Sequence, residues 1–215
     1  NNTIKANDTY SFYQSKSIKQ SLAEQNLYEA QHNGDKARAV EMAAKIDRYE
    51  NEPKEGKKDL LAKAKAEAVV TNPLAQDALI IGCDSALDLD GEALGKPHLA
   101  EVAIERWKNM RGRSGRLYTG HWLIDNRNGG VMPPANGMAT STVVHFANLS
   151  DEEIVAYVGT GEPLKVAGAF TIDGLGGAFI KAIEGDAHTV VGLSLPTLRE
   201  LCIGLEVDYP SLWRS

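Results

Sequence analysis

The chain has 215 residues, of which 43% are hydrophobic and 24% are charged. This balance supplies enough apolar surface for a packed core, so the composition excludes a fully disordered chain. The net charge of −6 argues against an extended nucleic-acid partner, because phosphate backbones bind to broad basic faces, although a few lysines could still hold a small anion.

Residues 1–58 are polar and contain no run of β-branched residues. Asp35 can cap a helix in which Ala39, Val40, Ala43 and Ile46 recur at helical spacing. Pro53 and the pair Lys57-Lys58 then mark a loop. We therefore expect a mainly helical N-terminal segment, packed at the edge or forming an arm, and not a second catalytic domain.

Residue 59 begins a second region, 59–215, in which helices and strands alternate. Asp59 can cap a helix that runs to Val70 and whose apolar side comprises Leu60, Leu61, Ala64 and Ala68. Ala78 to Cys83 is a continuous apolar run, which is typical of a strand buried on both faces. Asp84 is therefore expected at the end of a buried strand, where a cleft could open.

The rest of this region continues the alternation. Leu99, Val102, Ala103, Trp107 and Met110 form a helical stripe, and residues 117–124 and 140–146 are predicted strands. Ser150 and Glu153 form a capping box for a helix to about Val158, residues 178–184 are a predicted strand, and Ser194 with Pro196 opens a last helix. The fold class is therefore α/β, a sheet flanked by helices, with ligands expected where strands end in loops.

Three clusters could carry chemistry. Asp84 follows the buried strand and could hold a divalent metal or accept a proton from water, unless it only caps a turn. In Gly95-Lys96-Pro97, a lysine stands before a helix, where phosphate is favoured, although most such lysines are solvated. The third cluster, Gly161-Glu162-Pro163-Leu164-Lys165, feeds into a glycine-rich stretch at 174–177 that indicates either a ligand loop or a tight chain crossing.

Other residues carry weaker signals. Lys63 and Lys65 are surface lysines by default. His98, His121, His145 and His188 lack metal-ligand spacing, and no Ser-His-Asp arrangement can be assembled from the sequence. From the residues alone, the chain is an α/β protein that binds a small anion.

Taken in order, these clusters resemble the Maf family of nucleotide pyrophosphatases, and most of all its actinobacterial branch. The resemblance covers roughly residues 60–205. It rests on Leu61-Ala62-x-x-Lys65-Ala66, Gly82-Cys83-Asp84-Ser85, Gly95-Lys96-Pro97, Arg113 to Gly120, Tyr157-x-x-x-Gly161-Glu162-Pro163-x-Lys165, Ile183 to Asp186 and Val190 to Pro196.

The resemblance implies an activity and a site. Maf-like proteins cleave nucleoside triphosphates between the α- and β-phosphates with Mg²⁺ or Mn²⁺, in a cleft between two lobes of a mixed, twisted sheet flanked by helices. This fold is similar to that of inosine triphosphate pyrophosphatases, and the proteins commonly form homodimers. The proton acceptor of the family falls on Asp84, which could also hold the metal. The phosphate-binding lysines fall on Lys65 and Lys96, with Lys165 as a further contact and Gly161 and Glu162 in the cleft.

The chain departs from the family pattern at three places. No Ser-x-x-Arg phosphate loop occurs in residues 1–58, so it either precedes Asn1 or has been lost, and the start without Met favours the first reading. The acidic residue that follows the family's second strand is not identifiable. The positions that read the base are Ser85 and Asp173 here, so the base preference stays open.

Two alternatives to a general pyrophosphatase follow. One is a nucleotide-binding regulator of septum formation or cell division with little turnover, and the other is an inosine triphosphate pyrophosphatase-type activity. The two cysteines, Cys83 and Cys202, lie in apolar surroundings and suggest a reduced, cytoplasmic protein. No stretch approaches the roughly 20 apolar residues of a membrane span, so no membrane partner is expected.

Overall fold

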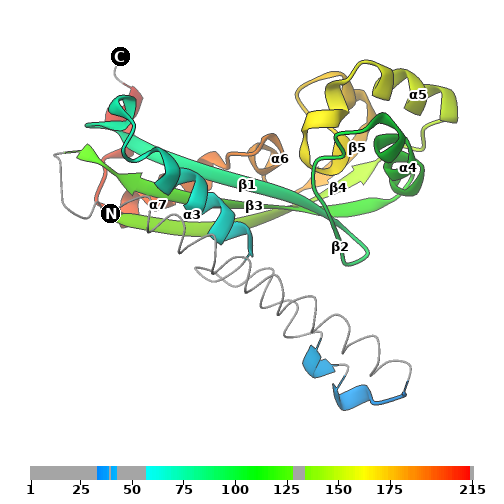
Figure 1. Ribbon diagram of the computed structural model, residues 1–215, viewed down its shortest axis with the longest axis horizontal. Coiled ribbons are helices and arrows are strands. Elements are labelled where there is room, and N and C mark those ends of the chain that lie inside the picture. The colour runs from blue at the N-terminus through cyan, green and yellow to red at the C-terminus, as the bar shows by residue number, and fades with distance from the viewer. Residues whose placement is uncertain (1–32, 39, 43–56, 128–133, 214–215) are drawn as a thin grey trace. The chain divides into compact units, whose positions relative to one another are not determined.

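The computed structural model describes residues 33–38, 40–42, 57–127 and 134–213 (Figure 1). Its core element is a five-stranded sheet with the order β2-β1-β3-β4-β5. The strands are β1 (Leu79–Leu89), β2 (Glu92–Leu94), β3 (Ser114–Asp125), β4 (Ala135–Phe146) and β5 (Ile180–Glu184). The sequence predicted a mixed sheet; both outer pairs, β1 with β2 and β4 with β5, are antiparallel.

Helices alternate with these strands along the chain, and the predicted α/β class is confirmed. They are α3 (Lys57–Val69), α4 (Ala100–Met110), α5 (Asp151–Gly159), α6 (Ala187–Val191) and α7 (Leu195–Gly204), with short 3-10 turns at Pro73–Ala75, Glu162–Lys165, Ala167–Ala169, Leu175–Phe179 and Tyr209–Trp213. The two-lobed cleft that the resemblance implies stays a prediction.

The chain divides into two compact units, and each is built from separate stretches of sequence. The first unit takes in Asn1–Asp84, Gly120–Ala139 and Arg199–Ser215, and the second takes in Ser85–Thr119 and Thr140–Leu198. The predicted boundary between residues 58 and 59 is a different division, and it stays a prediction.

In the described part of the first unit, one buried cluster forms where α3 packs against β1. Ala66, Ala75, Ile80 and Ile124 are its buried members. Gly82 lets the helix and the strand come into close contact, because a Cβ atom there would lie 2.1 Å from the carbonyl oxygen of Ala62. The sequence placed Ala64 and Ala68 on the apolar side of this helix, which is wrong, since Ala62 and Ala66 are the buried alanines.

The core of the second unit combines aliphatic residues with a cluster of aromatic rings. Trp107, fully buried on α4, makes edge-to-face contacts with Phe146, Tyr157 and Phe179 at centroid distances of 5.7, 5.6 and 5.9 Å. Its indole nitrogen donates a hydrogen bond to the carbonyl oxygen of Ala169 at 2.7 Å. Leu99 and Val102, which the sequence placed on the same stripe, are exposed. Leu99 precedes the helix as its N-cap, and Val102 lies in its first turn.

The predicted helix caps can be compared directly with the structure. The Ser150 side chain accepts from the Glu153 backbone and the Glu153 side chain accepts from the Ser150 backbone, so the capping box is confirmed. Ser194 accepts from the backbone of Thr197, as expected for the cap of α7, and Asp35 accepts from the backbone of Arg38. Asp59 is not a cap, because α3 begins two residues earlier, at Lys57. Ala39, Ala43, Ile46 and Pro53 lie outside the described residues.

Candidate functional site

The structure brings Lys65 and Asp84 together. Lys65 extends from α3, which packs on β1 through the gap left by Gly82, and Asp84 stands on β1 two residues later. The Lys65 ammonium lies 2.5 Å from Asp84 Oδ1 and donates a second hydrogen bond to the carbonyl oxygen of Cys83 at 2.9 Å. The Lys65 side chain is half exposed and that of Asp84 is 20% exposed, so solvent and a ligand can reach the pair.

Asp84 does not end its strand, contrary to the sequence prediction. β1 continues to Leu89, and Asp84 is the sixth of its eleven residues. The prediction stopped at Cys83 because the continuous apolar run ends there, but Leu87 and Leu89 are buried in alternation and carry the strand onward. The strand is not buried on both faces either, since its fully buried positions alternate with partly exposed ones.

Cys83 lies beside this pair, and its surroundings favour the protonated thiol. Burial raises the pKa of its thiol to about 11, and the charge of Asp84 adds to this, while the charge of Lys65 opposes it. The thiol therefore stays protonated at neutral pH, where a reactive cysteine would be a thiolate. Lys65 and Asp84 are the charged groups of this site.

Ser85 is hydrogen-bonded to the hydroxyl group of Thr119 in the second unit. Its Oγ lies 2.9 Å from Thr119 Oγ1, and that hydroxyl donates to the carbonyl oxygen of Thr189 at 2.9 Å. Because Thr119 uses its proton on Thr189, its oxygen accepts from Ser85. The predicted specificity residue therefore has a fixed side chain whose proton is already bonded.

Lys96 and Lys165 stand on two loops of the second unit that are hydrogen-bonded to each other. The backbone nitrogen of Gly168 donates to the carbonyl oxygen of Gly95 at 3.2 Å, and that of His98 donates to Leu164 at 3.0 Å. Arg106 also donates to the carbonyl oxygen of Gly95, at 2.5 Å. Both lysines are exposed, so the loops present two positive charges to solvent.

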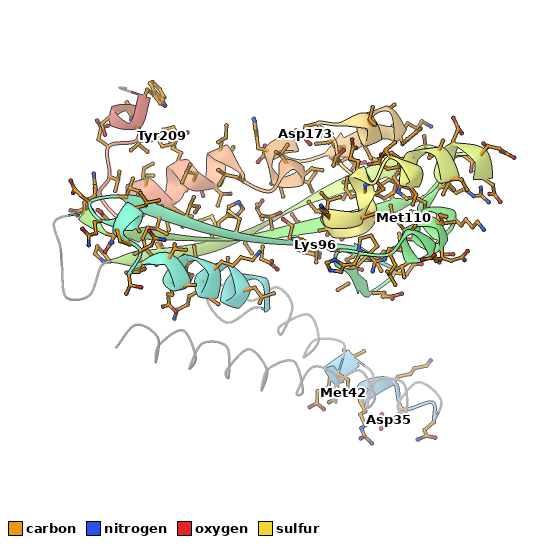
Figure 2. All side chains as sticks on the ribbon, turned by 45° about the horizontal axis from the view of Figure 1, so that its top comes forward. Asp35, Met42, Lys96, Met110, Asp173 and Tyr209 are labelled. Atoms are coloured by element: carbon orange, nitrogen blue, oxygen red, sulfur yellow. The ribbon has the colours of Figure 1, made fainter. Side chains whose placement is uncertain are left out.

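Glu162 and Asp173 differ sharply in their surroundings. The Glu162 carboxylate accepts hydrogen bonds from Tyr157, Thr171, Leu175 and Gly176. Burial raises its pKa, but these hydrogen bonds together outweigh burial and lower the pKa to about 2. Gly161, with a φ of 76°, provides the left-handed turn before Glu162. Asp173 is exposed on a loop of the same unit, and Lys96 is exposed as well (both labelled in Figure 2).

The site around Asp84 offers few side chains that could bind a metal ion. Among the described residues, no three His, Cys, Asp or Glu side chains are grouped so that they could hold a metal ion. Mg²⁺ often binds through one or two carboxylates together with substrate phosphates and water. Asp84 therefore fits as a single carboxylate ligand, and a complete protein cage does not.

The structure also assembles residues that the sequence could not connect. Ser114 Oγ lies 2.6 Å from His145 Nδ1, and His145 Nε2 lies 2.9 Å from Glu184 Oε1. The three residues stand on β3, β4 and β5, and only the pairing of these strands brings them together. Ser114 and Glu184 are exposed, so this chain is a surface network of hydrogen bonds.

Comparison with known proteins adds to this geometry. The family model for "Maf-like protein" matches residues 21–204. A "Nucleoside triphosphate pyrophosphatase" of Leifsonia xyli is 54% identical over 156 residues, which cover 72% of each chain. Proteins of the same name from Salinispora tropica (56% over 156 residues, 71% of this chain and 67% of the relative) and Streptomyces avermitilis (54% over 153 residues, 71% and 72%) are similarly close.

Proposed function

The chain belongs to the Maf-like protein family, and we propose on that premise that it hydrolyses nucleoside triphosphates to the monophosphate and pyrophosphate. The relatives named above, more than half identical to it over most of its length, carry the name of this activity. The observation that carries the proposal is the 2.5 Å contact between Lys65 and Asp84, which joins the two charged residues of the Leu-Ala-x-x-Lys and Gly-Cys-Asp-Ser motifs.

Asp84 is the proton acceptor in this proposal. Water attacks the α-phosphorus, and its proton passes to the Asp84 carboxylate. The bond from the α-phosphorus to the bridging oxygen breaks, and pyrophosphate leaves with the electron pair. The Lys65 ammonium, 2.5 Å from the carboxylate, orients it before the substrate arrives and is a cation within reach of a phosphate oxygen.

Lys96 and Lys165 are proposed as further phosphate contacts. Charge accumulates on the leaving pyrophosphate, and positive groups that are held in place beforehand stabilise it. The hydrogen bonds between the two loops, from Gly168 to Gly95 and from His98 to Leu164, hold the backbone of both lysines in this way. Ser85 and Asp173 are proposed to contact the base.

A divalent cation, Mg²⁺ or Mn²⁺, belongs to the proposal. Asp84 would hold it together with phosphate oxygens of the substrate, in keeping with the few ligands that Mg²⁺ takes from proteins. When bound, the cation neutralises negative charge on the phosphates. Asp84→Asn, described below, tests whether the Asp84 carboxylate is needed for the reaction.

We also propose a cytoplasmic homodimer, as the resemblance implies. Neither Cys83 nor Cys202 forms a disulfide, and burial raises the pKa of both thiols, which suits a reducing compartment. Within the described ranges, no helix has the length and apolar character needed to cross a membrane. Light scattering on the purified full chain measures the mass that decides the oligomeric state.

Asp84→Asn tests the proposal. We expect the variant to lose pyrophosphate release by at least about 100-fold, because the amide neither accepts the proton nor carries the charge. The assay uses a panel of canonical and modified triphosphates with Mg²⁺ or Mn²⁺. Asp88→Asn is the matched control, since Asp88 lies on the same strand and, among the residues that the structure describes, its side chain accepts from the backbone nitrogen of Gly91.

Three outcomes separate the functions. Turnover of a triphosphate by the wild type, lost in Asp84→Asn and kept in Asp88→Asn, supports the proposal. Near-normal turnover in Asp84→Asn removes Asp84 from the chemistry. Tight triphosphate binding without turnover of any substrate in the panel supports the nucleotide-binding regulator instead.

A further inference from the structure

The Glu162 carboxylate joins two loops of the second unit. It stands at the start of the turn Glu162–Lys165 and accepts from the Thr171 hydroxyl at 2.5 Å and from the backbone nitrogens of Leu175 and Gly176 at 3.0 and 2.9 Å. These three donors lie on either side of Asp173. The segment 171–177 is therefore wrapped around a side chain of the preceding loop.

Tyr157 anchors this arrangement to the core. Its hydroxyl donates to Glu162 at 2.9 Å, and its ring packs edge-to-face on Trp107 and Phe179 at 5.6 and 5.2 Å. Tyr157 itself is 3% exposed. The Glu162 carboxylate thus has a fixed position relative to the aromatic core, and its hydrogen bonds hold the segment 171–177 in place relative to that core.

Close contacts also require the glycines of this segment, two of them with Glu162 and Tyr157. A Cβ atom on Gly174 would lie 2.8 Å from Glu162 Oε2, and one on Gly176 would lie 2.3 Å from the Tyr157 hydroxyl oxygen. One on Gly177 would lie 2.6 Å from the carbonyl oxygen of Ile172. The glycine-rich stretch is accordingly shaped around a carboxylate of its own chain.

Only a carboxylate satisfies this site. All four partners of Glu162 donate hydrogen bonds, and an ionised carboxylate accepts at both of its oxygens. The amide group of a glutamine at this position would place its own NH₂ donor against one of these donors. Asp173 lies between these donors, and its side chain forms no hydrogen bond or ion pair with any residue that the structure describes. Its position follows from the contacts that Glu162 makes on each side of it.

We infer that Glu162 is a positioning residue that holds the segment 171–177, and with it Asp173, in the place from which Asp173 discriminates between bases. The inference rests on the proposed triphosphate hydrolysis and on the proposed contact of Asp173 with the base. Glu162 does not contact the substrate in this scheme, because its oxygens are engaged by the four donors. Glu162 affects base discrimination by fixing the position of Asp173.

Glu162→Gln, assayed with CTP and UTP, tests the inference. These two substrates share ribose and triphosphate and differ at the base edge, where cytosine carries an amino group and uracil a carbonyl. We expect the KM of the preferred substrate to rise by about 10-fold or more, because small misplacements of a binding group have large effects. The ratio of kcat/KM between CTP and UTP should move toward one, while kcat changes less than KM.

Companion variants separate positioning from folding. Glu162→Asp keeps the charge and should recover part of the discrimination, and Tyr157→Phe keeps the buried ring but removes one donor and should lose part of it. Glu101→Gln, an exposed residue of α4, is the matched control and should leave both constants unchanged. Circular dichroism and thermal unfolding of each variant establish that it is folded.

The outcomes are distinct. A folded Glu162→Gln with unchanged KM and an unchanged ratio overturns the inference and leaves the proposed function intact. A loss confined to kcat and melting temperature, with KM and the ratio unchanged, shows a purely structural role and overturns it too. A wild type that does not discriminate between CTP and UTP also overturns it, and a wild type without any turnover removes the proposed function as well.

Discussion

At the scale of single residues, Asp173 offers the most direct test of base recognition. Its carboxylate accepts hydrogen bonds and cannot donate them, so it suits a base that presents an amino group. We therefore expect CTP to be favoured over UTP. Asp173→Asn, whose amide both donates and accepts, should reduce that preference by about 1 to 3 kcal/mol, measured as the change in the kcat/KM ratio.

The control for Asp173→Asn is Asp88→Asn, which makes the same chemical change on β1. An unchanged ratio in Asp173→Asn would place base recognition elsewhere, with Ser85 as the next candidate. Turnover of a preferred substrate should persist in the variant, because Asp173 is proposed to bind the base and not to act on phosphorus.

Some residue contacts could be predicted from the sequence, and others could not. The resemblance assigns the motifs of Lys65 and Asp84 to one site, and the structure has the two side chains in contact, although their pairing itself was not predicted. The role of Glu162 could not be predicted in the same way. Its partners Thr171, Leu175 and Gly176 are 9 to 14 residues away in an irregular loop, where no periodicity indicates a contact.

At the scale of elements, the contact of α3 with β1 determines whether Lys65 reaches Asp84. Gly82→Ala should destabilise the protein by about 1 to 3 kcal/mol, because the added Cβ would lie 2.1 Å from a backbone oxygen of α3 and the helix must move. Urea unfolding measures this change. Pyrophosphate release should fall as well, since Lys65 moves with the helix.

The matched control is Gly159→Ala, at the end of α5, where a Cβ atom meets nothing within 4 Å and φ is not positive. It should leave stability and activity unchanged or raise stability slightly, because alanine favours the helix. A Gly82→Ala protein as stable and active as this control would show that α3 and β1 tolerate a wider spacing.

Elements with strong local signals were predicted well. The capping box of α5 is confirmed because Ser150 and Glu153 are three residues apart and satisfy each other locally. The predicted end of β1 and the predicted buried face of α3 were wrong, because both depend on packing between elements. Ser85–Leu89 contains two aspartate- or serine-bearing positions between its apolar residues, so the sequence does not distinguish this half-buried strand from a loop. Several alanines of α3 are equivalent in sequence, and only the close approach of Gly82 shows that Ala62 and Ala66 face the strand.

At the scale of the whole molecule, the two units are interleaved in sequence, since each is assembled from separate stretches of the chain. No shift in composition marks their limits, and β1, β3 and β4 each contain residues of both units. This is why the sequence predicted a boundary at residue 58, where composition changes, and could not predict a division that long-range contacts create.

The free energy of unfolding of the whole chain should fall at acidic pH, because two carboxylates of the second unit become protonated. For Asp186, burial raises the pKa, but hydrogen bonds from Ser194, His188 and Thr189 outweigh it and lower the pKa to about 2, as for Glu162. Both pKa values lie below the ordinary values of 3.8 and 4.5, so each group stabilises the folded state above its ordinary pKa. That stabilisation is lost as pH falls through the window from 4.5 to about 2.

Urea unfolding from pH 6 to pH 2 measures this loss, and Glu162→Gln identifies its source. The wild type should lose unfolding free energy through the acid window. The variant should start lower at pH 6 and lose less on acidification, because it has one titrating group fewer, so the two curves converge near pH 2. Parallel curves would show that Glu162 does not contribute. Convergence would show that the charge which holds the segment 171–177 also stabilises the whole chain.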